Sequence, residues 1–152
     1  MPTLPEPLFR RAVLGLTGRP SDDRIVRIAC QLAKPYKSEI VGVHVVEIDW
    51  TLPLDADVAG RSEDVQRVLD VAEATAEEIG YALTPVLLQA RDVGAAIVDE
   101  ASERGADLVM LGLEYRTRFG GDFAMGQTIP YVLKNAACAV WVVREPMAGE
   151  QP

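Results

Sequence analysis

Short apolar segments alternate with amphipathic helical segments along almost the whole chain, and this alternation limits the fold more than any other feature. Residues 39–46 (EIVGVHVV) form a β-branched run that is bounded by breakers and is too short for a typical helix. Such a run predicts a strand that is buried on both faces of a sheet. Four further apolar runs predict strands at residues 12–16, 83–89, 108–111 and 139–143.

Helical periodicity fills the intervals between these strands. After Ser21, apolar residues recur with helical spacing until Pro35, and a second such pattern runs over residues 65–79 and closes at Gly80. Asp92 is placed to cap a third helix, and a short fourth helix is expected over residues 129–135. The order β-α-β-α-β-α-β-α-β predicts one α/β domain, a parallel sheet with helices on both faces.

Sheets of this kind bind ligands outside the carboxyl ends of their strands, where the strand order reverses. With the first strand central, this crevice lies between the first and fourth strands and is bounded by residues 17–21 and 112–128. The second loop is glycine-rich and leads into a helix, where backbone N–H groups can approach a phosphate. Arg116 and Arg118 could add donors. The alternative is a surface loop whose glycines only serve turns. The loop is neither a P-loop nor a GxGxxG motif.

The chain resembles the universal stress protein family over about residues 9–145. The segments that carry the resemblance agree with the family in order and spacing: residues 16–19 (LTGR), 44–46 (HVV), 92–101 (DVGAAIVDEA), 106–112 (ADLVMLG) and 126–144 (GQTIPYVLKNAACAVWVVR). The resemblance implies an adenine nucleotide alpha hydrolase-like sheet of strand order 3-2-1-4-5. It leaves residues 1–8 as a disordered arm and 146–152 as a disordered tail around a domain of residues 9–145.

The family commonly forms homodimers through the last strand, which here begins at Ala139 and ends at Val143. An exposed edge strand is a ready template for such pairing. Trp141 lies on this strand and is either a buried anchor of the dimer or a residue that packs on its own sheet.

Family members that bind ATP carry the loop Gly-x2-Gly-x9-Gly-Ser/Thr, and this chain departs from it. Gly112 matches the first glycine, but Tyr115 stands at the second. Gly126 comes one residue late, Gln127 replaces Ser/Thr, and Thr128 follows one position further on. These departures predict that the chain does not bind ATP in the ordinary pose.

The end of the first strand departs as well, because Thr17 stands where ATP-binding members have an adenine-contacting Asp. Val45 can still offer its backbone to an adenine edge. An adenine nucleotide is therefore the ligand to test, and no cofactor or metal is expected. The candidate binding residues are Thr17, Gly18, Val45, Gly112, Arg116, Gly126, Gln127 and Thr128.

The resemblance implies a stress-associated regulatory or binding protein. We do not expect an enzyme, because a single histidine, His44, and two scattered cysteines provide no nucleophile–base set or zinc site. The alternative is a sensor of AMP, a cyclic nucleotide, a dinucleotide or ATP in the crevice between the first and fourth strands, which could regulate a transporter. A slow ATPase is the third hypothesis.

Charge excludes several partners. The chain has 23 acids and 15 bases, a net of −8, and residues 47–80 hold ten acids and two bases. Such a protein binds nucleic acid and anionic membranes poorly. No apolar run is long enough to insert into a membrane and no signal core is present, so we expect a cytoplasmic protein. The acidic segment 47–80 is either a solubilising face or a docking surface for a basic partner.

Overall fold

A computed structural model of the chain describes residues 5–53, 62–115 and 125–147. Five parallel strands form one sheet in the order β3-β2-β1-β4-β5, as the resemblance implies. The strands are β1 (Arg11–Leu16), β2 (Glu39–Glu47), β3 (Thr84–Ala90), β4 (Leu108–Leu113) and β5 (Ala139–Arg144). The predicted fold class is therefore confirmed.

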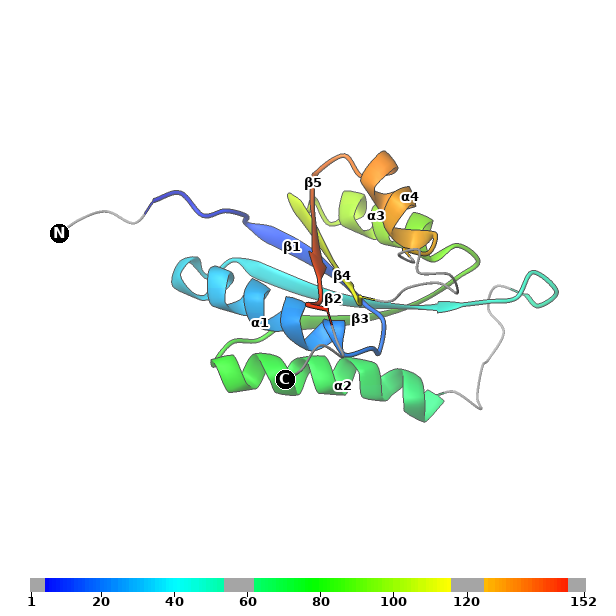
Figure 1. Cartoon of the computed structure of the whole chain (residues 1–152), viewed down its shortest axis with the longest axis horizontal. Helices are drawn as coiled ribbons and strands as arrows, with labels where there is room; N and C mark the ends of the chain where they lie inside the picture. Colours follow the sequence, from blue (N-terminus) through cyan, green and yellow to red (C-terminus); the bar gives the residue numbers. More distant parts are fainter. Residues whose placement is uncertain (1–4, 54–61, 116–124, 148–152) are drawn as a thin grey trace.

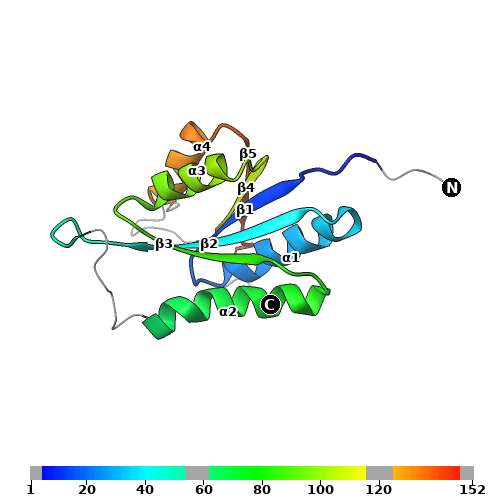
Figure 2. The ribbon, with the colours of Figure 1, turned by 180° about the vertical axis from the view of Figure 1, so that it is seen from behind.

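Two helices cover each face of the sheet (Figures 1 and 2). One face carries α1 (Ser21–Ala33), a 3-10 turn at Lys34–Tyr36 and α2 (Ser62–Ile79), and the other carries α3 (Val93–Glu103) and α4 (Thr128–Asn135). Successive side chains of a strand point to opposite faces, so β1 contributes Leu14 to the core beneath α1 and Val13 to the core beneath α3. All five residues from Ala12 to Leu16 are buried, which places β1 at the centre of the molecule.

Most element boundaries lie within one to three residues of those predicted from the sequence. The largest difference within the sheet is in β4, which continues through Gly112 to Leu113 because both residues pair with β5. The expected cap of α3 is present, since the Asp92 carboxylate accepts a hydrogen bond from the Ala95 amide at 3.0 Å.

The N-terminal segment joins the sheet before β1 begins. Phe9 is buried, and its ring meets that of Trp141 edge to face, with centroids 6.1 Å apart. The Asp107 carboxylate accepts hydrogen bonds from the amides of Arg10 and Arg11 at 2.9–3.1 Å. Residues 5–8 and 146–147 form no helix or strand, and the rest of the predicted arm and tail lies outside the described residues.

Within the part of the chain that the structure describes, no helix is both long and apolar enough to cross a membrane.

Candidate functional site

A cavity opens where β1 parts from its neighbours at the carboxyl end of the sheet. Pairing of β1 with β4 ends at Gly15 and Leu111, and pairing with β2 ends at Leu16 and His44. The cavity has a volume of about 380 Å³. It lies at the predicted switch point of the sheet.

Six of the eight candidate residues line this cavity: Thr17, Val45, Gly112, Gly126, Gln127 and Thr128. Gly18 instead lines a neighbouring cavity of about 790 Å³ on the α2 side of the sheet. Arg116 lies outside the described residues, as do Arg118, Gly120 and Gly121.

The floor and walls of the cavity are apolar. Val43 and Val45 of β2, Leu111 of β4, Ile97 of α3 and Ile129 of α4 line it, and all five belong to the core beneath α3 and α4. Apolar walls combined with polar groups at the rim are typical of sites that bind small molecules.

One rim of the cavity is the loop between β1 and α1, and Asp22 holds this loop in shape. Asp22 is only 8% exposed. Its carboxylate accepts hydrogen bonds from the Thr17 amide at 2.9 Å and the Gly18 amide at 2.7 Å. The sequence predicts Asp22 as an acid in the first turn of a helix, and the structure places it there. Its carboxylate also accepts hydrogen bonds from the loop that precedes the helix.

The Thr17 side chain is used within the same loop. Its hydroxyl donates a hydrogen bond to Asp22 Oδ1 at 3.2 Å and accepts one from the Arg19 amide at 3.2 Å. The Thr17 hydroxyl is thus engaged by the Asp22 carboxylate and the Arg19 amide, and only one acceptor lone pair remains for a ligand.

Gly112 has a packing role that its place in the loop signature does not reveal. A Cβ at this position would lie 2.8 Å from both Cβ and Oγ of Ser21 and 3.1 Å from the Ser21 carbonyl oxygen. The first residue of α1 therefore approaches the β4 backbone so closely that only glycine fits. Ser21 lies within the predicted boundary of residues 17–21, but its close packing against Gly112 was not predicted.

Gly126 and the first turn of α4 form the opposite rim. Gly126 has a φ of +77°, and a Cβ there would meet none of the described residues within 4 Å. The α4 N-cap residue, Gln127, makes no side-chain cap hydrogen bond. The first N–H groups of a helix lack intrahelical acceptors, so this rim presents donors to the cavity, although Pro130 removes one of them.

Two charged side chains lie at the rim, and sequence reasoning did not select either of them. Among the described residues that line the cavity, Arg19 is the one cation and Glu114 the one carboxylate. Arg19 Nε lies 3.8 Å from Glu114 Oε1, a long ion pair between two loops. Because the Arg19 side chain is exposed, this pair is weak, and an anion at this rim would meet both charges.

Tyr115, at the position of the second glycine of the signature, does not line the cavity. The Arg144 guanidinium lies 4.9 Å from the centre of the Tyr115 ring, which places the ring on the β5 side of β4. Arg144 pairs in register with Leu113 at the end of β4, so the Tyr115 ring lies beside the end of β5.

His44 makes the hydrogen bond expected of a core histidine. Its Nδ1 donates to the Leu16 carbonyl oxygen at 2.8 Å, although the side chain is half-buried and borders both cavities. In the described ranges, no group of three His, Cys, Asp or Glu residues is arranged to hold a metal ion.

Fold and cavity together define a single-domain, doubly wound α/β protein with a ligand-sized crevice at the switch point of its sheet. Sequence comparison makes the assignment specific. The profile of the Universal stress protein family matches residues 8–144, so the chain belongs to this family.

Individual relatives agree with this assignment. Universal stress protein MJ0531 of Methanocaldococcus jannaschii is 26% identical over 147 residues, which cover 93% of this chain and 85% of that protein. The structure of the universal stress protein from Archaeoglobus fulgidus in complex with dAMP has a TM-score of 0.69 at 18% identity, covering 90% of this chain and 98% of the other. An Arabidopsis thaliana family protein with AMP bound has a TM-score of 0.62 at 15% identity, covering 93% and 95%.

Proposed function

We propose that this chain is a non-catalytic regulatory protein that binds an adenosine monophosphate in the crevice between β1 and β4, and that it does not bind ATP in the ordinary pose. The observation that carries the proposal is a cavity of about 380 Å³ at the switch point, with apolar walls and a rim at which Arg19, the cation among its described lining residues, lies beside Glu114.

The apolar walls support a base as the buried part of the ligand. Val45 and Ile129 approach from different elements and offer contact surface for a ring. The side of β2 that faces β1 has no strand beside it after His44, so backbone groups at Val45 are accessible to a base edge. Backbone hydrogen bonds of this kind fix the orientation of a ligand in an otherwise apolar pocket.

The first turn of α4 supports a single phosphate. Its free N–H groups and the positive end of the helix dipole favour an anion, and the open space beside Gly126 leaves room for one. Among the described residues, the longer phosphate chain of ATP would place more negative charge beside Glu114, with Arg19 as the cation of the rim. The relatives whose structures contain AMP or dAMP support a monophosphate in this fold.

Calorimetry and thermal-shift measurements with AMP, dAMP, cyclic AMP, ATP and adenosine test the proposal. At 100 times its Kd, AMP should stabilise the protein by about 2.7 kcal/mol, and ATP should bind more weakly than AMP. Gly126→Asp places a carboxylate at the phosphate position and should abolish the shift. The matched control is Gly105→Asp, since Gly105 also has a positive φ but does not line the cavity.

The proposal is wrong if none of these compounds shifts the melting temperature, or if ATP binds more tightly than AMP. Retained binding in Gly126→Asp would place the ligand elsewhere. Chromatography of ATP and AMP after long incubation with the protein checks the absence of catalysis, and both compounds should be recovered unchanged.

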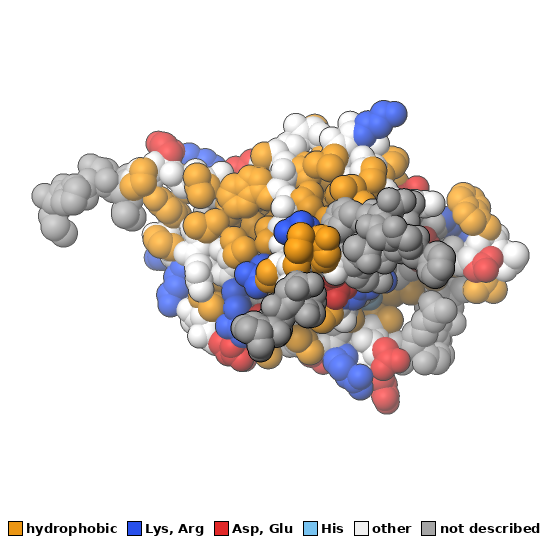
Figure 3. Space-filling view, viewed as in Figure 1, with side chains coloured by type: hydrophobic (Ala, Val, Ile, Leu, Met, Phe, Trp, Pro, Cys, Tyr) orange, Lys and Arg blue, Asp and Glu red, His pale blue; other side chains and the backbone are white. Residues whose placement is uncertain are grey.

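We also propose that the protein forms a homodimer through β5. Hydrophobic side chains gather over this edge strand on the face seen in Figure 3, and Val140 and Val142 are only partly buried. Trp141 packs against Phe9 within the chain, so the valines and the strand edge would supply most of the contact. Val142→Lys should yield a monomer in light scattering, whereas Leu87→Lys on the opposite edge strand should not. An unchanged mass for Val142→Lys would refute this interface.

A further inference from the structure

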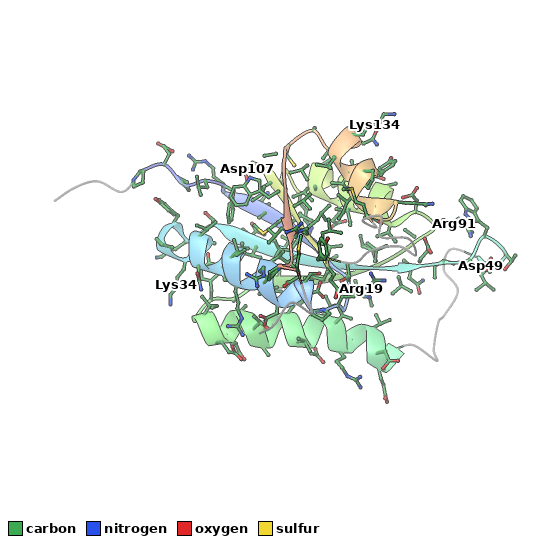
Figure 4. The ribbon with its side chains drawn as sticks, in the orientation of Figure 1. Arg19, Lys34, Asp49, Arg91, Asp107 and Lys134 are labelled. Carbon is green, nitrogen blue, oxygen red and sulfur yellow. The ribbon has the colours of Figure 1, made fainter. Side chains whose placement is uncertain are left out.

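Glu114 brings a carboxylate to the mouth of the crevice. It directly follows β4, whose pairing with β1 ends at Gly15 and Leu111, so the two strands have already separated at this level. Glu114 Oε1 nevertheless lies 3.8 Å from Nε of Arg19, in the loop that follows β1. The two side chains together therefore span the gap between the separated strands. Figure 4 shows Arg19 at the end of the sheet, where this loop leads into α1.

The side of the sheet on which Glu114 lies follows from the alternation along β4. Leu113 packs against the core beneath α3 and α4, whereas a Cβ on Gly112 would meet Ser21 of α1. Successive side chains point to opposite faces, so Glu114 lies on the same side as Gly112, and its contact with Arg19 agrees with this. The carboxylate and the first turn of α4 thus lie at opposite rims of the cavity.

The Glu114 carboxylate retains its capacity to accept hydrogen bonds. Its contact with Arg19 at 3.8 Å is too long for a hydrogen bond. Among the described residues, no hydrogen bond reaches either of its oxygens. The side chain is only 22% exposed, so the carboxylate is partly withdrawn from water. An ionised carboxylate can only accept, and a partly buried acceptor is stabilised by a donor that a ligand supplies.

Other acceptors at the end of β1 are already engaged. The Leu16 carbonyl oxygen accepts a hydrogen bond from His44 Nδ1, and the Asp22 carboxylate accepts hydrogen bonds from the β1–α1 loop. The Thr17 hydroxyl keeps one lone pair. Among the described residues of this rim, Glu114 therefore offers the charged acceptor that is free for a ligand.

A ribose is the part of an adenosine monophosphate that matches this acceptor. An ionised phosphate has no donor to offer and would be repelled by a carboxylate. The neighbouring 2′- and 3′-hydroxyl groups of a ribose are two donors, and acidic side chains accept hydrogen bonds from ribose in other doubly wound sheets. We propose that Glu114 is a specificity-determining residue, which accepts a hydrogen bond from a ribose hydroxyl and so selects ribonucleotides over deoxyribonucleotides. This inference rests on the proposed nucleotide site.

The assignment orders the ligand along the crevice. The base contacts the apolar wall that includes Val45 and Ile129, and the phosphate lies at the first turn of α4 beside Gly126. The ribose joins them and faces Glu114 from the middle of the crevice. Because the carboxylate and α4 occupy opposite rims, the phosphate can approach the helix while it stays away from the negative charge.

Sugar analogues of AMP test the inference. Calorimetry measures the Kd values of AMP, 2′-deoxy-AMP and 3′-deoxy-AMP for the unaltered protein and for Glu114→Ala. At least one deoxy analogue should bind the unaltered protein about tenfold more weakly than AMP, because it lacks a hydrogen bond to a charged group. In Glu114→Ala this preference should disappear. The ratio of Kd values is the readout, since the loss of a negative charge by itself would strengthen the binding of all three compounds alike.

Two further variants make the result specific. Glu114→Gln keeps an acceptor oxygen without the charge and should retain a reduced preference for AMP. Glu145→Ala is the matched control, because the Glu145 side chain is also 22% exposed and pairs with an arginine, Arg24, at 3.3 Å, but does not line the cavity. Its preference should equal that of the unaltered protein.

The outcomes separate this inference from the proposed function. If AMP and both analogues bind the unaltered protein equally well, or if Glu114→Ala keeps the preference, the role of Glu114 is refuted and the nucleotide site stands. If none of the three compounds binds, the nucleotide site is refuted and the role of Glu114 with it.

Discussion

Replacement of Asp22 by alanine should both destabilise the fold and weaken the binding of AMP in the crevice. The carboxylate is 8% exposed and accepts hydrogen bonds from the amides of Thr17 and Gly18 and from the Thr17 hydroxyl. The alanine variant leaves two backbone N–H groups without an acceptor in the loop that forms one rim of the ligand cavity. The loop can satisfy them only by rearranging toward water.

The magnitude follows from these contacts. A hydrogen bond to a charged group contributes about 1.5–3 kcal/mol, and contributions within one network do not add fully. We therefore expect Asp22→Ala to lower the free energy of unfolding by about 3 kcal/mol. For a chain of this length, this corresponds to a fall in Tm of about 6–12 °C. Asp22→Asn keeps one acceptor oxygen but places an NH2 group against a donor, so its effect should be intermediate.

Urea denaturation followed by circular dichroism measures the free energy of unfolding of each variant. Titration of the folded variants with AMP measures their affinity for the nucleotide. Asp23→Ala is the matched control, because Asp23 is the next residue of α1 but forms only an exposed ion pair with Arg27. Exposed pairs contribute about 0–1 kcal/mol. If Asp22→Ala costs no more than Asp23→Ala, or leaves AMP affinity unchanged, the role assigned to this carboxylate is wrong.

Gly112→Ala should lower the free energy of unfolding by about 1–3 kcal/mol, because the new Cβ would lie 2.8 Å from Ser21 side-chain atoms. Gly126→Ala meets no described residue and should lower it by about 1 kcal/mol, for its positive φ alone. Equal losses in urea denaturation would contradict the packing argument. Burial raises the pKa of the Cys30 and Cys138 thiols above the ordinary value, so alkylation at pH 8 should be much slower in the native protein than in urea. The two neutral thiols should contribute fully to the free energy of unfolding below about pH 8.5. This contribution should be lost as the pH rises through their raised pKa values. A free energy of unfolding that rises with pH over this range would contradict the prediction.

The candidate site could be predicted in part, and the reason differs between residues. The loops that hold Thr17 and Gly126 were predicted because strand ends and glycine loops have local signatures, whereas Val45 was selected only through the family resemblance. Glu114 and Arg19 lie within the two predicted loops, but no local signature indicated that their side chains pair across the crevice. Tyr115 stands at the second glycine of the loop signature, but its ring lies against the Arg144 guanidinium and does not line the cavity of about 380 Å³.

Periodicity and composition of the sequence determined the order of helices and strands, the parallel sheet and the location of the crevice, because strand and helix patterns are local and crossover handedness is nearly universal. Only the tertiary structure determined which contacts form the rim and walls of the crevice. It showed that Asp22 supports the β1–α1 loop, that Gly112 makes room for α1, and that Arg19 faces a carboxylate. These contacts join groups from different segments, or join a helix residue to the loop before it. Their free energies depend on distances that only the packed chain defines.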